Sequence, residues 1–267
     1  QMCIRDRTSA YASIANGGTY QKPVLYTKVV DHNGNILLSN TQKGKRVMKE
    51  STAFLLTDAM KDVITKGTGK SAKLSSSMAV AGKSGTTSNS YDYWFSGYTP
   101  YHTASVWMGY DKNTNFASDN THKKIWAKVM NEIIKTKQEQ TTDFKKPADI
   151  VKAKVCKESG KLAIKGVCDH DPRGSRVITE YFEKGTVPTQ TCDIHVAVEV
   201  CKTSDKLATK NCPANKKQRK IYIVRKKGSH GKTADTPYML PKKYQSVFCK
   251  KPVSYTHLRA HETPEHL

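Results

Sequence analysis

The sequence contains no apolar run that approaches the roughly 18 residues needed to cross a membrane. It also lacks, near its first residues, the charged stretch and apolar core of an export leader. We therefore expect any export signal or membrane anchor to lie outside this chain. A third absence is the Cys-x₂-Cys pair of common zinc motifs, although the sequence holds seven cysteines.

Acidic residues are scarce: 23 Asp and Glu stand against 45 Lys and Arg, and the formal net charge is +22. The imbalance is largest after residue 120, where 31 basic residues stand against 15 acidic ones. Charge of this kind suggests an anionic neighbour such as nucleic acid, a lipid surface or an anionic wall polymer, but composition alone favours a solvated lysine-rich surface. The basic run 216–220 (KKQRK) has no interleaved aromatic residues, so we expect no nucleic-acid partner.

Both ends of the chain differ from the rest. Residues 1–7 (QMCIRDR) and 253–267 (VSYTHLRAHETPEHL) show no periodicity and resemble translated sequencing-adaptor tails. We leave them out of the fold prediction. On this interpretation the chain is expected to be a fragment cut at both ends.

Residues 8–137 alternate between helical and extended patterns. The spacing predicts helices over 8–16, 51–65 and 123–134, strands over 24–31 and 36–38 joined by an Asn-Gly turn, and strands over 83–87, 93–98 and 104–110. The predicted inward faces are Phe54, Leu55, Ala59, Val63 and Ile64 on the second helix and Ile125, Trp126, Val129 and Ile133 on the third. This order indicates an α+β fold, with an antiparallel sheet covered by helices.

A polar stretch, 138–149, includes Pro147 and predicts a linker to a second, basic domain over 150–252. That domain contains an internal repeat, because 155–163 (VCKESGKLA) matches 200–208 (VCKTSDKLA). Each copy is followed by one more cysteine, which gives two cysteine pairs at nearly equal spacing. We expect this tail to be small and rich in β-structure.

The paired spacing predicts two local disulfides, between Cys156 and Cys168 and between Cys201 and Cys212. Cys192 and Cys249 leave other connectivities open. Zinc is the rival interpretation, but without Cys-x₂-Cys and with His195 as the only well-placed histidine we expect no metal and no cofactor. Disulfides in turn imply an oxidising, extracytoplasmic setting.

Residues suited to chemistry concentrate in 81–87 (AGKSGTT), directly after the apolar segment 78–81 (MAVA). Gly85 removes a side chain that would block the approach of a ligand to the backbone. Lys83 supplies a cation, and Ser84 and Thr86 supply hydroxyl donors suited to a carboxylate. The stretch therefore predicts a strand edge that binds an anionic ligand, and an ordinary turn is the alternative.

Four blocks follow one another along the first half of the chain: 67–70 (GTGK), 81–87 (AGKSGTT), 94–100 (WFSGYTP) and 106–111 (VWMGYD). Together they resemble the last part of the transpeptidase domain of class A penicillin-binding proteins. Residues 8–20 (TSAYASIANGGTY) are similar to the family's segment just upstream, and the cysteine-containing tail resembles extensions of some Gram-positive members. The main match covers about half of the chain.

The resemblance implies a partial DD-peptidase/β-lactamase-like fold and a parent enzyme, a serine-type D,D-transpeptidase. Such an enzyme cross-links peptidoglycan stem peptides at the extracytoplasmic face of the membrane and is acylated by β-lactams. The resemblance also implies a glycosyltransferase domain elsewhere in a class A parent.

The family builds its site from three motifs, Ser-x-x-Lys, Ser-x-Asn and Lys-Thr/Ser-Gly, of which only the third is in place here. By resemblance, Lys83 would hold the charge and proton network around the serine. The hydroxyls of Ser84 and Thr86 would bind the substrate carboxylate, within a binding segment that includes Gly85 and Thr87. The backbone N–H of Thr86 would be one oxyanion-hole donor.

Two short matches to the missing motifs stand in the wrong places: 118–120 (SDN) follows Lys83 when it should precede it, and 229–232 (SHGK) lies in the basic tail. We therefore expect the nucleophile to be absent and the chain to be inactive alone. Two alternatives remain: a non-catalytic module that binds cell wall or a partner protein through 150–252, and a β-lactamase-like hydrolase on the same fold.

Overall fold

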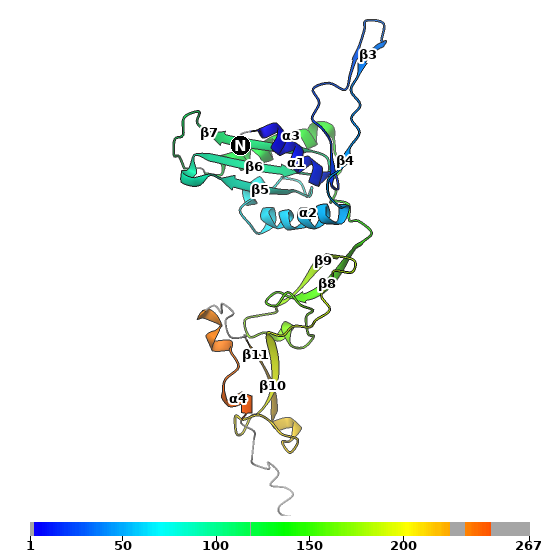
Figure 1. Ribbon diagram of the computed structural model, residues 1–267. Coiled ribbons are helices and arrows are strands. Elements are labelled where there is room, and N and C mark those ends of the chain that lie inside the picture. Colours follow the sequence, from blue (N-terminus) through cyan, green and yellow to red (C-terminus); the bar gives the residue numbers. More distant parts are fainter. Residues whose placement is uncertain (1–2, 118, 225–232, 247–267) are drawn as a thin grey trace, which may run out of the picture. The chain divides into compact units, whose positions relative to one another are not determined.

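The computed structural model describes residues 3–117, 119–224 and 233–246 (Figure 1). The chain divides into two compact units, Gln1–Val151 and Lys152–Leu267. Among the described residues, no helix combines the length and the apolar character that a membrane crossing requires.

The first unit is organised around a three-stranded antiparallel sheet in the order β5-β6-β7 (Ala81–Thr86, Asp92–Tyr98 and Thr103–Gly109). The register pairs Lys83 with Ser96 and Trp94 with Trp107. A turn joins β6 to β7, where the Thr99 hydroxyl accepts the backbone N–H groups of Tyr101 and His102. The three predicted strands are confirmed.

Three helices cover the sheet: α1 (Ile4–Ala15), α2 (Glu50–Thr65) and α3 (Thr121–Lys137) (Figure 1). Alternate residues of a strand face opposite sides, so Phe95 packs edge-on against Trp126 of α3, whereas Tyr98 belongs to the cluster that includes Met60 and residues of α1. Helix α2 runs beside β5 and supplies residues to both clusters. The predicted α+β class, a sheet covered by helices, is confirmed.

A long hairpin extends from the first unit, with strands β2 (Lys28–Val30) and β3 (Ile36–Ser39). Gly34 has a φ of +86°, and the Asp31 carboxylate accepts the backbone N–H groups of Asn33 and Asn35. The Asn-Gly turn predicted from the sequence is therefore confirmed. The short strands β1 (Thr19–Tyr20) and β4 (Lys45–Arg46) pair at the base of this excursion.

Two predicted helix faces are wrong in part. Helix α2 buries Ala53, Thr57 and Met60 together with the predicted Ile64, while Ala59 is exposed. Thr57 lies inside because its hydroxyl bonds the Tyr98 hydroxyl at 2.8 Å. The N-cap residue of this helix is Lys49.

The buried face of helix α3 also differs from the predicted one. Trp126 is fully buried as expected, but Ile125 and Val129 are 44% and 46% exposed. Met130 and the charged Lys123 take the inward positions instead. After this helix the chain stays on the first unit, where Phe144 packs edge-on against Tyr98.

The second unit contains two two-stranded ribbons. Strand β8 pairs with β9 (Ile150–Cys156 and Val177–Glu183), and β10 pairs antiparallel with β11 (His195–Cys201 and Lys217–Ile223). The sequence repeat is also a structural repeat. Cys156 and Cys201 each donate their N–H to the carbonyl five residues later, on Lys161 and Lys206, at 2.8 Å. The remaining described helices are short: η1 (Lys70–Ala72), η2 (Ser88–Ser90), η3 (Cys168–His170), η4 (Ala214–Lys216), η5 (Thr233–Tyr238) and α4 (Lys243–Ser246).

Candidate functional site

Strand β5 places the predicted anion-binding residues along an edge of the described sheet. Lys83, Gly85 and Thr86 are exposed, and Ser84 is half-buried. Among the strands that the structure describes, β5 pairs with β6 alone, so the stretch is a strand edge and not an ordinary turn.

The two glycines of β5 differ in what surrounds them. A Cβ atom at Gly82 would lie 2.8–2.9 Å from the Phe95 ring, the Gly97 Cα and the Ser96 carbonyl, so the sheet itself requires glycine there. A Cβ atom at Gly85 would meet only the Trp94 Cβ, at an ordinary 3.6 Å. Packing inside the protein therefore does not account for Gly85, and the space above it is available for a ligand.

Ser84 is held by a short chain of hydrogen bonds. Its hydroxyl lies 2.9 Å from the Thr68 hydroxyl, and its carbonyl accepts the Lys83 ammonium at 2.7 Å. The Thr68 carbonyl and the Asn120 side chain in turn accept the Lys123 ammonium at 2.8 and 2.7 Å. The Gly-Thr-Gly segment found in the sequence thus supports the neighbouring strand.

Lys123 is a second cation near this edge that sequence reasoning missed. Burial lowers the pKa of Lys123, and the positive charge of Lys83 lowers it further. The side chain is 7% exposed. Nothing in the sequence separated this lysine from the other basic residues of the chain, because its burial depends on Thr68 and Asn120.

Thr87 lies just beyond β5 and closes the connection to β6. Its hydroxyl accepts the Asp92 N–H at 2.9 Å and donates to the Asp92 carboxylate at 3.2 Å. The same carboxylate accepts the Trp107 indole N–H at 2.8 Å. Thr87 therefore anchors the loop that follows the Lys-Ser-Gly segment.

The two displaced motif matches add no site. Asn120 of the Ser-Asp-Asn match precedes the first turn of α3 and binds Lys123, while Ser118 lies outside the described residues. The Ser-His-Gly-Lys match at 229–232 also lies outside them.

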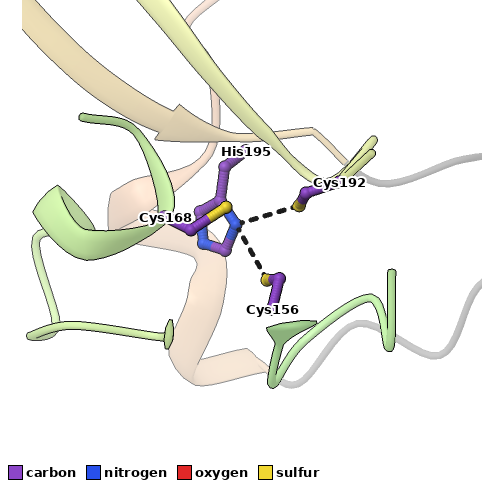
Figure 2. Close-up of side chains that lie close together, drawn as sticks. All are labelled: Cys156, Cys168, Cys192 and His195. Atoms are coloured by element: carbon purple, nitrogen blue, oxygen red, sulfur yellow. Dashed lines mark hydrogen bonds between the residues drawn. The ribbon is translucent and has the colours of Figure 1, made fainter. Parts of the chain in front are cut away.

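The disulfides predicted at Cys156, Cys168, Cys201 and Cys212 are not confirmed: within the described residues, neither Cys156 with Cys168 nor Cys201 with Cys212 forms a disulfide. Cys249 lies outside those residues. The physical reason in the first repeat is that Cys156 and Cys168 do not form an isolated pair. They lie around one point with Cys192 and His195 (Figure 2).

The thiols of this cluster have unlike environments. Burial raises the pKa of the Cys168 thiol to about 12. Burial also acts to raise the pKa of Cys192, but hydrogen bonds from Ser159 and His195 outweigh it and bring the pKa to about 6. A sequence signal for the cluster existed in Cys192-Asp193-Ile194-His195, a Cys-x₂-His pair that the search for Cys-x₂-Cys passed over.

Comparison with known proteins gives two family matches. Residues 7–135 match the penicillin binding protein transpeptidase domain, and residues 146–197 match the C-terminal domain of penicillin-binding protein 1A. The chain belongs to the penicillin-binding protein family. The family resemblance noted in the sequence is confirmed, and β5 lies in the first matched domain, whereas the cysteine–histidine cluster lies in the second.

Among relatives, penicillin-binding protein 1A of Clostridium botulinum is 36% identical over 238 residues, which cover 87% of this chain and 28% of the relative. Penicillin-binding protein 1A/1B of Bacillus subtilis is 32% identical over 196 residues, covering 67% and 21%. The chain thus spans only about a quarter of the length of such relatives.

The crystal structure of penicillin-binding protein 1A from Haemophilus influenzae shares the fold of this chain. Its TM-score is 0.56 at 22% identity, and the match covers 71% of this chain and 33% of that one.

Proposed function

We propose that this chain forms one wall of the site of a serine D,D-transpeptidase, which cross-links peptidoglycan stem peptides and is acylated by β-lactams. The observation that supports this most directly is the exposed edge of β5. A cation, two hydroxyls and an open glycine lie there in consecutive positions.

In this proposal the edge binds an anionic acyl substrate. The hydroxyls of Ser84 and Thr86 hold the carboxylate of the stem peptide or of a β-lactam, and Gly85 admits the substrate close to the strand. Lys83, with Lys123 behind it, provides positive potential for that carboxylate and for the proton network of the serine.

The reaction has two acyl transfers. The hydroxyl of a serine supplied by the parent enzyme attacks the substrate carbonyl, and the leaving amine takes up a proton as the acyl-serine forms. The amine of a second stem peptide then attacks the acyl-serine and restores the hydroxyl. The backbone N–H of Thr86 donates to the oxyanion in both steps. We assign the nucleophile to no residue of this chain.

This activity implies a site at the extracytoplasmic face of the bacterial membrane, facing the cell wall. It requires no cofactor, and the chain would reach the membrane only through an anchor elsewhere in the parent. The assignment includes no nucleic-acid partner.

The test is acylation of the parent enzyme, carrying this chain, by a labelled penicillin. We expect Lys83→Ala to slow acylation by about 10²-fold or more, because the charge acts where negative charge develops. Lys135→Ala removes an exposed lysine of α3 and is the matched control. Acylation of the Lys83 variant at the unaltered rate would refute the role given to this lysine.

A second proposed role concerns the basic region 150–252, which would bind an anionic wall polymer or a partner protein. The charge excess after residue 120 favours this role. The full chain should be retained on purified cell wall and be released by moderate salt, because screening weakens contacts between exposed charges. Passage through the wall fraction without retention at low salt would reduce the region to a spacer.

A further inference from the structure

The cysteine–histidine cluster, Cys156, Cys168, Cys192 and His195, offers four ligand atoms that all lie within 4.8 Å of one another. Each residue is between 0% and 5% exposed. Figure 2 shows the three sulfur atoms and the imidazole ring directed at a common centre. Because a buried polar group needs a partner, four such groups converging on one point indicate a common ligand.

Three separate segments bring these residues together. Cys156 ends β8, Cys168 begins the short helix η3, and His195 begins β10. Backbone hydrogen bonds fix the loop that carries Cys192, since its N–H donates to the Leu162 carbonyl at 2.8 Å. The cluster thus joins the first cysteine repeat to the start of the second ribbon.

We propose that the cluster is a structural zinc site with Cys₃His ligation. At ordinary Zn–S and Zn–N bond lengths, a tetrahedral site has S···S edges of about 3.8 Å and S···N edges of about 3.6 Å. The His195 Nδ1 atom lies 3.4 Å from the Cys156 sulfur and 3.3 Å from the Cys192 sulfur. These two edges are slightly shorter than the tetrahedral value, and no two of the four ligand atoms lie more than 4.8 Å apart, so small shifts of the ligand atoms complete the tetrahedron.

The surroundings of His195 fit a metal ligand. Its Nε2–H donates to the Asp171 carboxylate at 2.6 Å, which leaves Nδ1 to face the sulfurs. Arg173 holds that carboxylate through its N–H, Nε and Nη2 groups, at 2.7–2.9 Å. A carboxylate behind a ligating histidine is the usual support of a zinc site, and a disulfide would need neither residue.

The sulfur atoms are supported as well. The backbone N–H of Ile164 donates to the Cys168 sulfur at 3.3 Å, an arrangement that stabilises a thiolate. Around the cluster the packed residues are few and small or half-buried: Ala163, Ile164, Val177 and Ile194. An apolar core of this size stabilises a fold weakly, so a metal is the natural centre of the module.

Donor type selects the metal. Three soft thiolates and one imidazole suit zinc, and four protein ligands leave no open position for a substrate. The centre is therefore structural and does not depend on the transpeptidase activity proposed above. In the second repeat Cys201 and Cys212 occupy the corresponding positions, but within 3–117, 119–224 and 233–246 no further ligands join them, so we assign no site there.

The test uses the full chain, purified in reduced form, with Zn²⁺ as the probe. Mass spectrometry of bound metal and competition with a chromogenic chelator give stoichiometry and affinity. We expect the Cys156→Ser chain and the Cys192→Ser chain each to lose one bound equivalent of Zn²⁺ relative to the unaltered chain, or to bind that Zn²⁺ more than about 100-fold more weakly. Cys3→Ser removes an exposed thiol outside the cluster and is expected to keep the full metal content.

A measurement on the unaltered chain does not depend on whether the variants fold. Substitution of Co²⁺ for Zn²⁺ should give the visible bands of a tetrahedral site and a thiolate-to-metal charge-transfer band. Absence of both spectral features, or a reduced chain that binds no Zn²⁺, overturns the proposal. So does peptide mapping that finds Cys156 disulfide-bonded to Cys168 in chain prepared without oxidant.

Asp171 is proposed as a positioning residue of this site. Asp171→Asn should weaken Zn²⁺ binding by about 10–100-fold while the Co²⁺ spectrum remains tetrahedral. Asp169→Asn is the control, since that carboxylate pairs with His170 instead. Unchanged affinity in the Asp171 variant would remove this residue from the site.

Discussion

The β5 edge and the cysteine–histidine cluster present their chemical groups in opposite ways. Lys83 and Thr86 are exposed on an open strand edge, whereas Cys168 and His195 are buried and directed at one another. Groups that must meet a substrate are left without full internal partners, while groups that hold a fold together satisfy each other. Under the two proposals above, the difference separates a site that acts on a ligand from a centre that stabilises a module.

We expect the largest effect when the proposed Zn²⁺ is removed from the cysteine–histidine cluster, because this should affect only one of the two regions compared. A strong chelator added to the zinc-loaded full chain should unfold the first cysteine repeat, because binding free energy at a structural zinc site is also folding free energy. Hydrogen exchange followed by mass spectrometry should show protection lost over 155–200 and kept over 81–110. Equal loss in both regions would contradict the separate roles given to them.

The first unit should instead depend on an apolar core. Trp126→Ala deletes a fully buried ring that packs against Phe95 and donates to the Ala104 carbonyl at 3.0 Å. We expect the first unit to lose about 3–5 kcal/mol of unfolding free energy, measured by denaturant titration. Ile125→Ala, one residue away and 44% exposed, is the control and should cost far less. Equal losses would mean that the sequence-based face of α3 was right after all.

Gly82 and Gly85 separate two requirements within strand β5, namely packing inside the sheet and access for a ligand. Gly82→Ala forces a Cβ into backbone and ring atoms at 2.8–2.9 Å, so it should cost about 1–3 kcal/mol of stability. Gly85→Ala should leave stability almost unchanged and slow acylation of the parent enzyme by penicillin. Thermal melting and acylation rates, measured on both variants, separate the two outcomes. A Gly85 variant with unaltered acylation would show that no ligand approaches there.

We expect the smallest effect on the stability of the first unit at low pH, through the carboxylate of Asp119. Hydrogen bonds from Thr121 and then from Lys124 lower the pKa of Asp119 from 3.8 to about 2. Because folding lowers the pKa of this carboxyl group, its charged form stabilises the fold at any pH above the pKa that the group has in the unfolded chain. This contribution is lost as the pH falls from about 4 to about 2.

Asp119→Asn should therefore slightly destabilise the first unit at neutral pH, and the difference from the unaltered chain should vanish near pH 2. Denaturant midpoints measured across that range check the prediction. A difference that persists at pH 2 would assign the effect to the geometry of the first turn of α3 and not to charge.

Local signals in the sequence determined the elements of this protein. Asn33-Gly34 determined the hairpin, and the alternation in 93–98 and 104–110 determined two strands that pair as expected. The Lys-Ser-Gly segment indicated the exposed strand edge at which we propose binding, because its cation, hydroxyls and glycine are consecutive and need no other part of the chain to be recognised.

Only the tertiary structure decided which groups those elements bury together. Lys123 of α3 is buried while the predicted Ile125 is exposed, because the Thr68 carbonyl, from another segment, and the Asn120 side chain, just before the helix, accept hydrogen bonds from the Lys123 ammonium. Cys156 and Cys168 are spaced like a disulfide pair, yet Cys192 and His195 arrive from residues far along the chain and complete a four-ligand cluster. The spacing of residues in the sequence identifies neighbours along the chain. The chemistry of a site also depends on residues that only folding brings together.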